Sequence, residues 1–316
     1  MIDRSIWLTQ RIPIQIGGAG KHNLGPIFWR VDPGRWSEFT RAVTSSAFCR
    51  AEILAPDVRR PNISHAIFDF DGTLSWLRHG WPQIMLQVFL RHAPAEWLND
   101  GEMHAQLLSD ILSLNGMPSI HQLKRCCGRV LENGDSIPKP EALLDEYLLT
   151  LHRIVSERID AVRNGTSHPD EFVVCNARRA LEILRDHGIT LIILSGTVET
   201  DVRAEAALLG LSSFFGDHIY GSPQKGAFSK KDVIDQIMRE EGINGNHLLA
   251  FGDGPVEITF SKAAGGLAIG VASDEEENGS HRMDAAKKQQ LIAAGADLVI
   301  PDYAEAQTLL AAILGT

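Results

Sequence analysis

The chain has 316 residues, a net charge of −10, 44% hydrophobic residues and 22% charged residues. The length exceeds one average domain, and the composition is typical of a folded globular protein. The acidic balance and the lack of a basic run argue against a nucleic-acid partner. No stretch approaches the roughly 20 apolar residues of a membrane helix, and the first residues do not resemble a secretory signal, so we expect a cytoplasmic protein without membrane contact.

Residues 1–62 form an N-terminal extension to which the sequence assigns no fold. Gly, Pro and Trp interrupt every periodic pattern in this segment, and only residues 36–48 predict a helix. Gly17, Gly18, Gly20 and Lys21 lack the spacing of a phosphate-binding loop, so we exclude one there.

The first predicted strand, residues 65–70 (HAIFDF), is followed by a long helical region. Apolar residues recur at helical intervals through residues 76–171, and no strand pattern interrupts them. The predicted helical segments are 82–92, 102–116, 119–134 and 141–162. We therefore predict an all-helical cap, residues 76–171, inserted after the first strand.

From residue 172 onward, short apolar runs alternate with amphipathic segments. The predicted strands are 189–194, 247–251, 266–271 and 296–300, and the predicted helices are 177–188, 198–210, 230–242 and 283–295. Such alternation indicates an α/β fold with a doubly wound, Rossmann-like parallel sheet. Residues 63–75 and 172–316 would together form this core.

The cysteines and histidines show no spacing that indicates a disulfide framework or a zinc site. We expect the four cysteines to be buried thiols or thiols without a function, and the twelve histidines to be surface or packing residues. The cysteines are Cys49, Cys126, Cys127 and Cys175. The acidic stretch 274–279 (DEEENG) predicts a solvated loop.

Chemically active side chains follow several of the predicted strands. Asp69 and Asp71 end the first strand, Ser195 and Thr197 the second, and Asp253 and Glu257 follow residues 247–251. Lys230 and Lys231 open a helix. Because the carboxyl ends of parallel strands meet at one sheet edge, we expect these groups to lie together.

This set of side chains suits phosphoryl chemistry. Clustered carboxylates are typical ligands of a hard cation, of which Mg²⁺ is the usual one beside phosphate. One carboxylate could attack phosphorus and a second could move the proton of the leaving group. A lysine and a hydroxyl would stabilise the transferring group. Taken alone, Asp69 and Asp71 could equally terminate a strand in an Asx turn.

Four segments in order resemble the haloacid dehalogenase (HAD) superfamily: DFDGT at 69–73, ILSGT at 193–197, FSKKDVI at 228–234 and FGDGPVE at 251–257. The resemblance covers the core and points to the phosphatase branch with an inserted helical cap, similar to phosphoglycolate phosphatases. Members that hydrolyse carbon–halogen bonds lack an acid at the position of Asp71.

The resemblance implies a role for each matching residue. Asp69 would be the nucleophile and Asp71 the general acid and base. Thr73, Ser195, Gly196 and a lysine would bind the phosphoryl group; we choose Lys230, with Lys231 and Lys225 as alternatives. The resemblance further implies that Mg²⁺ would be bound by Asp69, the Asp71 backbone carbonyl, Asp253 and Glu257. Glu257 replaces the family's usual aspartate, which leaves direct or water-mediated ligation open.

We therefore expect a Mg²⁺-dependent phosphatase that hydrolyses a small phosphorylated metabolite, such as a sugar phosphate or a phosphoglycolate-like molecule, through an aspartyl-phosphate on Asp69. Two alternatives stay open: a phosphomutase or other phosphotransferase that uses the same aspartate, and a non-catalytic binding protein on this fold. For Arg78 and His79, just past the catalytic loop, contact with the substrate stays open, although we expect both to be exposed to solvent.

Overall fold

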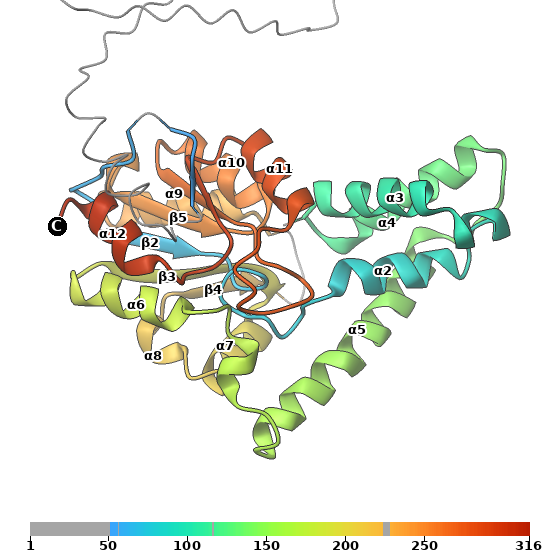
Figure 1. Cartoon of the computed structure of the whole chain (residues 1–316), viewed down its shortest axis with the longest axis horizontal. Coiled ribbons are helices and arrows are strands. Elements are labelled where there is room, and N and C mark those ends of the chain that lie inside the picture. The colour runs from blue at the N-terminus through green and yellow to red at the C-terminus, as the bar shows by residue number, and fades with distance from the viewer. Residues whose placement is uncertain (1–50, 56, 116, 224–227) are drawn as a thin grey trace, which may run out of the picture.

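A computed structural model describes residues 51–55, 57–115, 117–223 and 228–316 (Figure 1). Most of the N-terminal extension, including the helix expected at 36–48, lies outside the described residues, as do Cys49 and Lys225.

The core is a seven-stranded sheet in the order β1-β7-β6-β5-β2-β3-β4. All neighbouring strands are parallel except the β1–β7 pair at the edge. This confirms the predicted α/β parallel-sheet fold. The strands are β1 Glu52–Ile53, β2 His65–Phe68, β3 Thr190–Val198, β4 Ile219–Ser222, β5 Leu248–Gly252, β6 Leu267–Val271 and β7 Leu298–Ile300.

Helices cover both faces of the sheet, which is why its strands read as continuous apolar runs. Successive residues of β2 alternate between the faces: Phe68 packs with residues of α6, α7 and α12, whereas Ile67 packs with Ile234 and Ile237 of α9. The core helices are α6 Ala177–Asp186, α7 Glu199–Leu208, α8 Ser212–Phe215, α9 Lys230–Glu240, α10 Pro255–Ala263, α11 Ala285–Ala293 and α12 Ala306–Leu314.

Four of the helices between β2 and β3, α2 to α5, lie together beside the sheet (Figure 1). They bury a hydrophobic cluster of their own, which includes Phe89, Leu107, Leu123 and Tyr147. Asp100 caps α3 by accepting hydrogen bonds from two backbone amides of its first turn. These helices are α2 Trp81–Leu90, α3 Gly101–Ser113, α4 Ser119–Glu132 and α5 Pro140–Arg163. No helix in the described part of the chain is long and apolar enough to span a membrane.

The strand order reverses at β2. The chain leaves β2 for β3 and β4 on one side and returns to β5 and β6 on the other. In open α/β sheets, ligands bind beyond the carboxyl ends of the strands at such a switch point. Phe68 and Phe251 stack there with ring centroids 4.6 Å apart, so the ends of β2 and β5 pack against each other through two aromatic side chains.

Candidate active site

Asp69 lies immediately after β2 and is paired with a lysine. Its backbone amide donates to Phe251 O (2.9 Å), which places its side chain at the sheet edge. Lys230, the first residue of α9, donates from Nζ to Asp69 Oδ1 (2.8 Å) and also contacts Glu257. Lys231 is exposed and pairs with Asp235. Of these two neighbouring lysines, Lys230 is the one that reaches the site.

Burial strongly affects the titration of this pair. It raises the pKa of Asp69 well above the usual value for aspartate, and the Lys230 charge only partly opposes this. Burial would lower the pKa of Lys230, but Asp69 and Glu257 outweigh it and the pKa is raised. Lys230 therefore stays positively charged. Because its charge only partly offsets the burial of Asp69, the ionised form of Asp69 would need a further cation nearby.

Asp253, which follows β5, packs directly against Gly72. Gly72 has a left-handed φ of 75°, and a Cβ at this residue would lie 2.1 Å from Asp253 Oδ2. The DFDGT segment therefore requires glycine for both backbone conformation and space. Burial raises the pKa of Asp253 to about 6.

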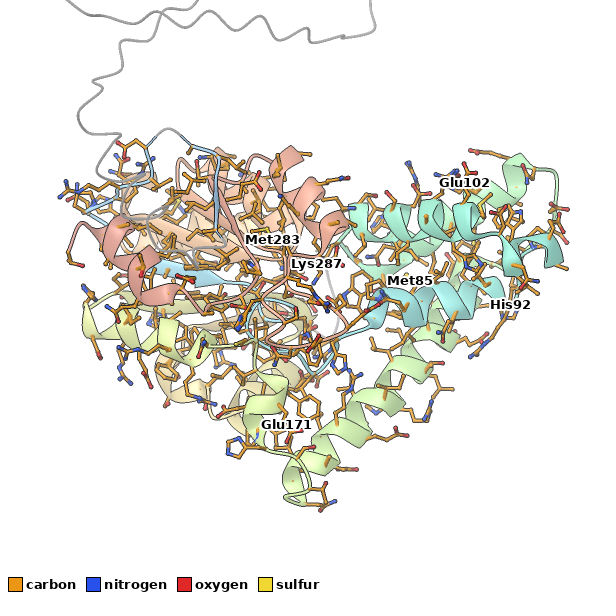
Figure 2. All side chains as sticks on the ribbon, in the orientation of Figure 1. Met85, His92, Glu102, Glu171, Met283 and Lys287 are labelled. Carbon is orange, nitrogen blue, oxygen red and sulfur yellow. The ribbon has the colours of Figure 1, made fainter. Side chains whose placement is uncertain are left out.

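A second buried lysine, which the sequence analysis missed, supports Asp253. Lys287 Nζ lies 3.1 Å from Asp253 Oδ2, contacts Glu275, and donates to Ser273 Oγ (3.2 Å). In Figure 2, Lys287 lies on the side of the core that faces the cap helices. No local pattern separates Lys287 from Lys288, which pairs with Glu52 outside this cluster.

Glu275 corrects the expectation that residues 274–279 are simply a solvated loop. Its side chain is buried, and besides Lys287 it accepts a hydrogen bond from the Gly80 amide (2.8 Å). The prediction failed for Glu275 because a run of acidic residues carries no information about distant partners.

Asp71 belongs to a second ionic network. Thr197 donates from Oγ1 to Asp71 Oδ2 (2.7 Å), and Arg78 donates from Nη1 to Asp71 Oδ1 (3.0 Å). Arg78 also binds Glu205, with 2.7 Å between Nη2 and Oε1. Burial alone would lower the pKa of Arg78, but the two carboxylates raise it. The expectation that Arg78 is exposed to solvent was wrong, because its side chain is largely buried in these ion pairs. The sequence could not show this, since Glu205 of α7 lies far from Arg78 along the chain.

The remaining predicted phosphate-binding residues line the same edge. Ser195 is buried, and its Oγ accepts from the Thr197 amide (3.1 Å). A Cβ on Gly196 would lie 4.0 Å from Cε of Lys230. Thr73 is also buried, and its Oγ1 has no hydrogen-bond partner within the described chain.

The charges around Asp69 and Asp253 fit a divalent cation. Among the described residues, four buried carboxylates, those of Asp69, Asp253, Glu257 and Glu275, face two buried ammonium groups, those of Lys230 and Lys287. The ionised set thus carries two excess negative charges, which are costly to bury without a counterion. Glu257 Oε2 is buried and accepts no hydrogen bond from any described residue. Oxygen donors of this kind suit Mg²⁺.

The sequence model of the haloacid dehalogenase-like hydrolases matches residues 63–265, most of the chain. The chain belongs to this family. The resemblance noted in the sequence is thus confirmed.

Solved structures share the fold. A haloacid dehalogenase-like protein of unknown function from Agrobacterium tumefaciens is 21% identical, with a TM-score of 0.56, and the match covers 79% of this chain and 98% of that one. A predicted phosphoglycolate phosphatase from Haemophilus somnus is 14% identical, with a TM-score of 0.51 and the same coverage. A family hydrolase from Deinococcus radiodurans with bound phosphate and sodium is 19% identical, with a TM-score of 0.50, over 80% of this chain and 98% of that one. A search of curated proteins finds no match.

Proposed function

We propose that this hydrolase is a Mg²⁺-dependent phosphatase that cleaves small phosphate monoesters through an aspartyl-phosphate on Asp69. The observation that carries the proposal is the position of Asp69 at the switch point of the sheet. Its Oδ1 is held by Lys230, while its Oδ2 accepts no hydrogen bond from any described residue. An oriented carboxylate with one oxygen available is suited to attack phosphorus.

Lys230, Ser195 and Thr73 would bind the oxygens of the transferring phosphoryl group. Lys230 would stabilise the negative charge that develops on these oxygens. Because Asp69 and Glu257 already hold the Lys230 side chain in place, it would not have to move during the reaction. The buried Thr73 hydroxyl, without a partner in the described chain, would gain one in a phosphoryl oxygen.

Asp71 would protonate the leaving oxygen and later deprotonate the attacking water. Thr197 and Arg78 each donate a hydrogen bond to its carboxylate, one to each oxygen, and so orient it for proton transfer.

Mg²⁺ would be held by Asp69, the Asp71 backbone carbonyl and Asp253, with Glu257 Oε2 as a further ligand or a partner of a bound water. When bound, the ion would neutralise charge on the phosphoryl oxygens and orient them for attack. Lys287 and Gly72 would position Asp253 for this role.

The helices α2–α5 would form a cap that selects the substrate. Asn115, after α3, donates from Nδ2 to Asp253 O (3.3 Å), so the cap reaches the edge of the site. A lid so close to the nucleophile favours small molecules, such as a sugar phosphate or a phosphoglycolate-like compound, and excludes bulk water.

The test is phosphate release from a panel of sugar phosphates and phosphoglycolate, with and without Mg²⁺, on the wild type, Asp69→Asn and Lys231→Met. We expect Mg²⁺-dependent turnover that falls at least about 10³-fold in Asp69→Asn and is unchanged in Lys231→Met. Turnover that survives in folded Asp69→Asn would overturn the proposal. A product phosphorylated on a new hydroxyl, without free phosphate, would instead show phosphoryl transfer. A folded wild type that binds Mg²⁺ but leaves the whole panel unchanged would favour a binding role.

A further inference from the structure

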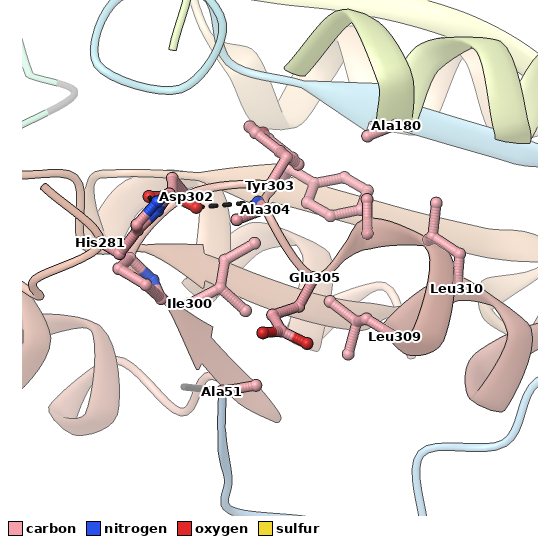
Figure 3. Close-up of a pocket in the computed structure, with 13 residues that line it drawn as sticks. Ala51, Ala180, His281, Ile300, Asp302, Tyr303, Ala304, Glu305, Leu309 and Leu310 are labelled. Carbon is pink, nitrogen blue, oxygen red and sulfur yellow. Dashed lines mark hydrogen bonds and ion pairs between the residues drawn. The ribbon is translucent and has the colours of Figure 1, made fainter. Parts of the chain in front are cut away.

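Cys175, His281 and Asp302 meet outside the candidate active site. One potential ligand atom from each residue lies within 4.8 Å of those of the other two. Cys175 precedes α6, His281 lies between β6 and α11, and Asp302 follows β7. Figure 3 shows His281 and Asp302 side by side at one end of a pocket. Three sequence-distant segments thus bring a sulfur, a nitrogen and an oxygen donor together.

The loops that carry these residues are held by specific hydrogen bonds. The Cys175 amide donates to Asn278 Oδ1 (3.0 Å), and Cys175 O accepts from the Tyr303 amide (3.0 Å). The Ala304 amide donates to Asp302 Oδ1 (2.8 Å). The donor atoms therefore sit on a pre-arranged backbone, as a metal site requires.

His281 and Asp302 show two further features of a built site. His281 has a φ of 58°, an unfavourable conformation for a residue with a side chain, and the surrounding fold maintains it. Asp302 is a buried carboxylate, and its Oδ2 lies 2.7 Å from His281 Nδ1. This contact is a hydrogen bond that already holds the two side chains together, and a metal ion bound to these two atoms would take the place of the proton that they share.

We propose that Cys175, His281 and Asp302 form a Zn²⁺ site that is separate from the Mg²⁺ site. Thiolate, imidazole and carboxylate together are typical zinc ligands, whereas Mg²⁺ takes oxygen ligands only. Tetrahedral zinc places ligand atoms roughly 3.3–3.8 Å apart, so the three donors must shift by about 1 Å or less.

The pocket beside the cluster leaves room for a fourth ligand. Its volume is about 200 Å³, and both His281 and Asp302 line it. Three protein ligands and one open position form the usual arrangement for a zinc ion that also binds water or a small molecule.

Zinc at this place would also fix the loop between β6 and α11. That loop carries His281 and Asn278 at one end and Glu275 at the other. Because Glu275 pairs with Lys287, which contacts Asp253, the zinc site would help position part of the catalytic edge.

Co²⁺ is the probe for this site, because thiolate ligation gives a charge-transfer absorption that an all-oxygen site cannot produce. Reduced full-length protein would be titrated with Co²⁺ in excess Mg²⁺ and then with Zn²⁺. The variants are Cys175→Ser, His281→Gln and Asp302→Asn, with Cys127→Ala, a buried thiol of the cap, as the matched control.

We expect one bound Co²⁺ with thiolate absorption that Zn²⁺ removes and Mg²⁺ does not. Each of the three site variants should lower the affinity more than about 10-fold, and Cys127→Ala should leave it unchanged. A folded wild type without this absorption, or absorption that persists in Cys175→Ser, would overturn the proposal. If Cys175→Ser fails to fold by circular dichroism, full affinity in folded His281→Gln and Asp302→Asn would overturn it equally.

Discussion

Gly72 shows how one residue constrains the site. Gly72→Ala would place a methyl group against the Asp253 carboxylate and hold alanine at a left-handed φ. We expect the free energy of unfolding to fall by at least about 1–2 kcal/mol from the backbone conformation alone. Phosphatase activity should fall by more than about 10-fold because Asp253 must move. Urea denaturation and Mg²⁺-dependent phosphate release measure the two effects.

Gly134→Ala is the matched control for this prediction. Gly134 has a φ of 84°, and a Cβ there meets nothing within 4 Å. It should lose similar backbone stability and keep full activity. Full activity in Gly72→Ala would contradict the proposed role of Asp253.

Lys230 and Lys231 are neighbours with opposite environments. Lys230→Met leaves Asp69 and Glu257 buried without their counterion, and breaking such a pair costs about 3–5 kcal/mol. Lys231→Met removes only an exposed helix pair and should change stability by less than about 0.5 kcal/mol. Comparing thermal unfolding and turnover of the two variants tests the choice of lysine. Equal effects would show that Lys230 has no special role.

At the scale of elements, Arg158 ties helix α5 to the segment that follows the catalytic loop. It donates from Nη1 to Leu77 O (2.5 Å) and His79 O (3.1 Å). Arg158→Ala removes these bonds, so amide hydrogen exchange should speed up at residues 77–80. We expect KM to rise because the cap is less well positioned.

Arg153→Ala on the same helix is the control, since Arg153 is exposed and, within the described part of the chain, forms an ion pair with Glu157 alone. Its exchange rates and KM should match the wild type. A result in which Arg158→Ala and Arg153→Ala behave alike would mean that α5 is not anchored through this arginine.

Helical and strand periodicity predicted most elements of the core and the four helices α2 to α5 beside the sheet. β4 was missed because Ile219–Ser222 is short, alternates buried with partly buried residues and contains a glycine, so it lacks the continuous apolar run of the central strands. β1 has only two residues and is defined by pairing with β7, which no local pattern reports.

At the scale of the molecule, the cap and the sheet bury separate hydrophobic clusters. Leu107 belongs to the cap cluster and Leu249 to the sheet cluster, and each is fully buried. Leu→Ala at either position should remove about 2–5 kcal/mol. Because the clusters are separate, Leu107→Ala should raise hydrogen exchange in α2–α5 and leave β2 and β5 protected.

Leu249→Ala is the complementary variant and should reduce protection in β2 and β5. Mass spectrometry of exchanged peptides resolves the two regions. If Leu107→Ala exposes β2 and β5 to the same extent as α2–α5, the cap and the core unfold as one unit.

The sequence by itself determined the parallel α/β fold, the strand-end positions of Asp69, Asp71, Ser195 and Asp253, and the family. These follow from short-range periodicity and from the general rule that the ends of parallel strands converge. Periodicity does not separate Lys230 from its neighbour Lys231, so the choice of Lys230 from the sequence rested on the family resemblance alone.

Only the tertiary structure brought Lys287 to Asp253, Arg78 to Glu205, and Cys175 to His281 and Asp302. The partners in each of these contacts lie far apart in the chain. Their meeting depends on the strand order and on how loops fold back over the sheet edge. Local patterns in the sequence report burial and periodicity, but they do not specify which distant charges or donor atoms will neutralise or bind one another.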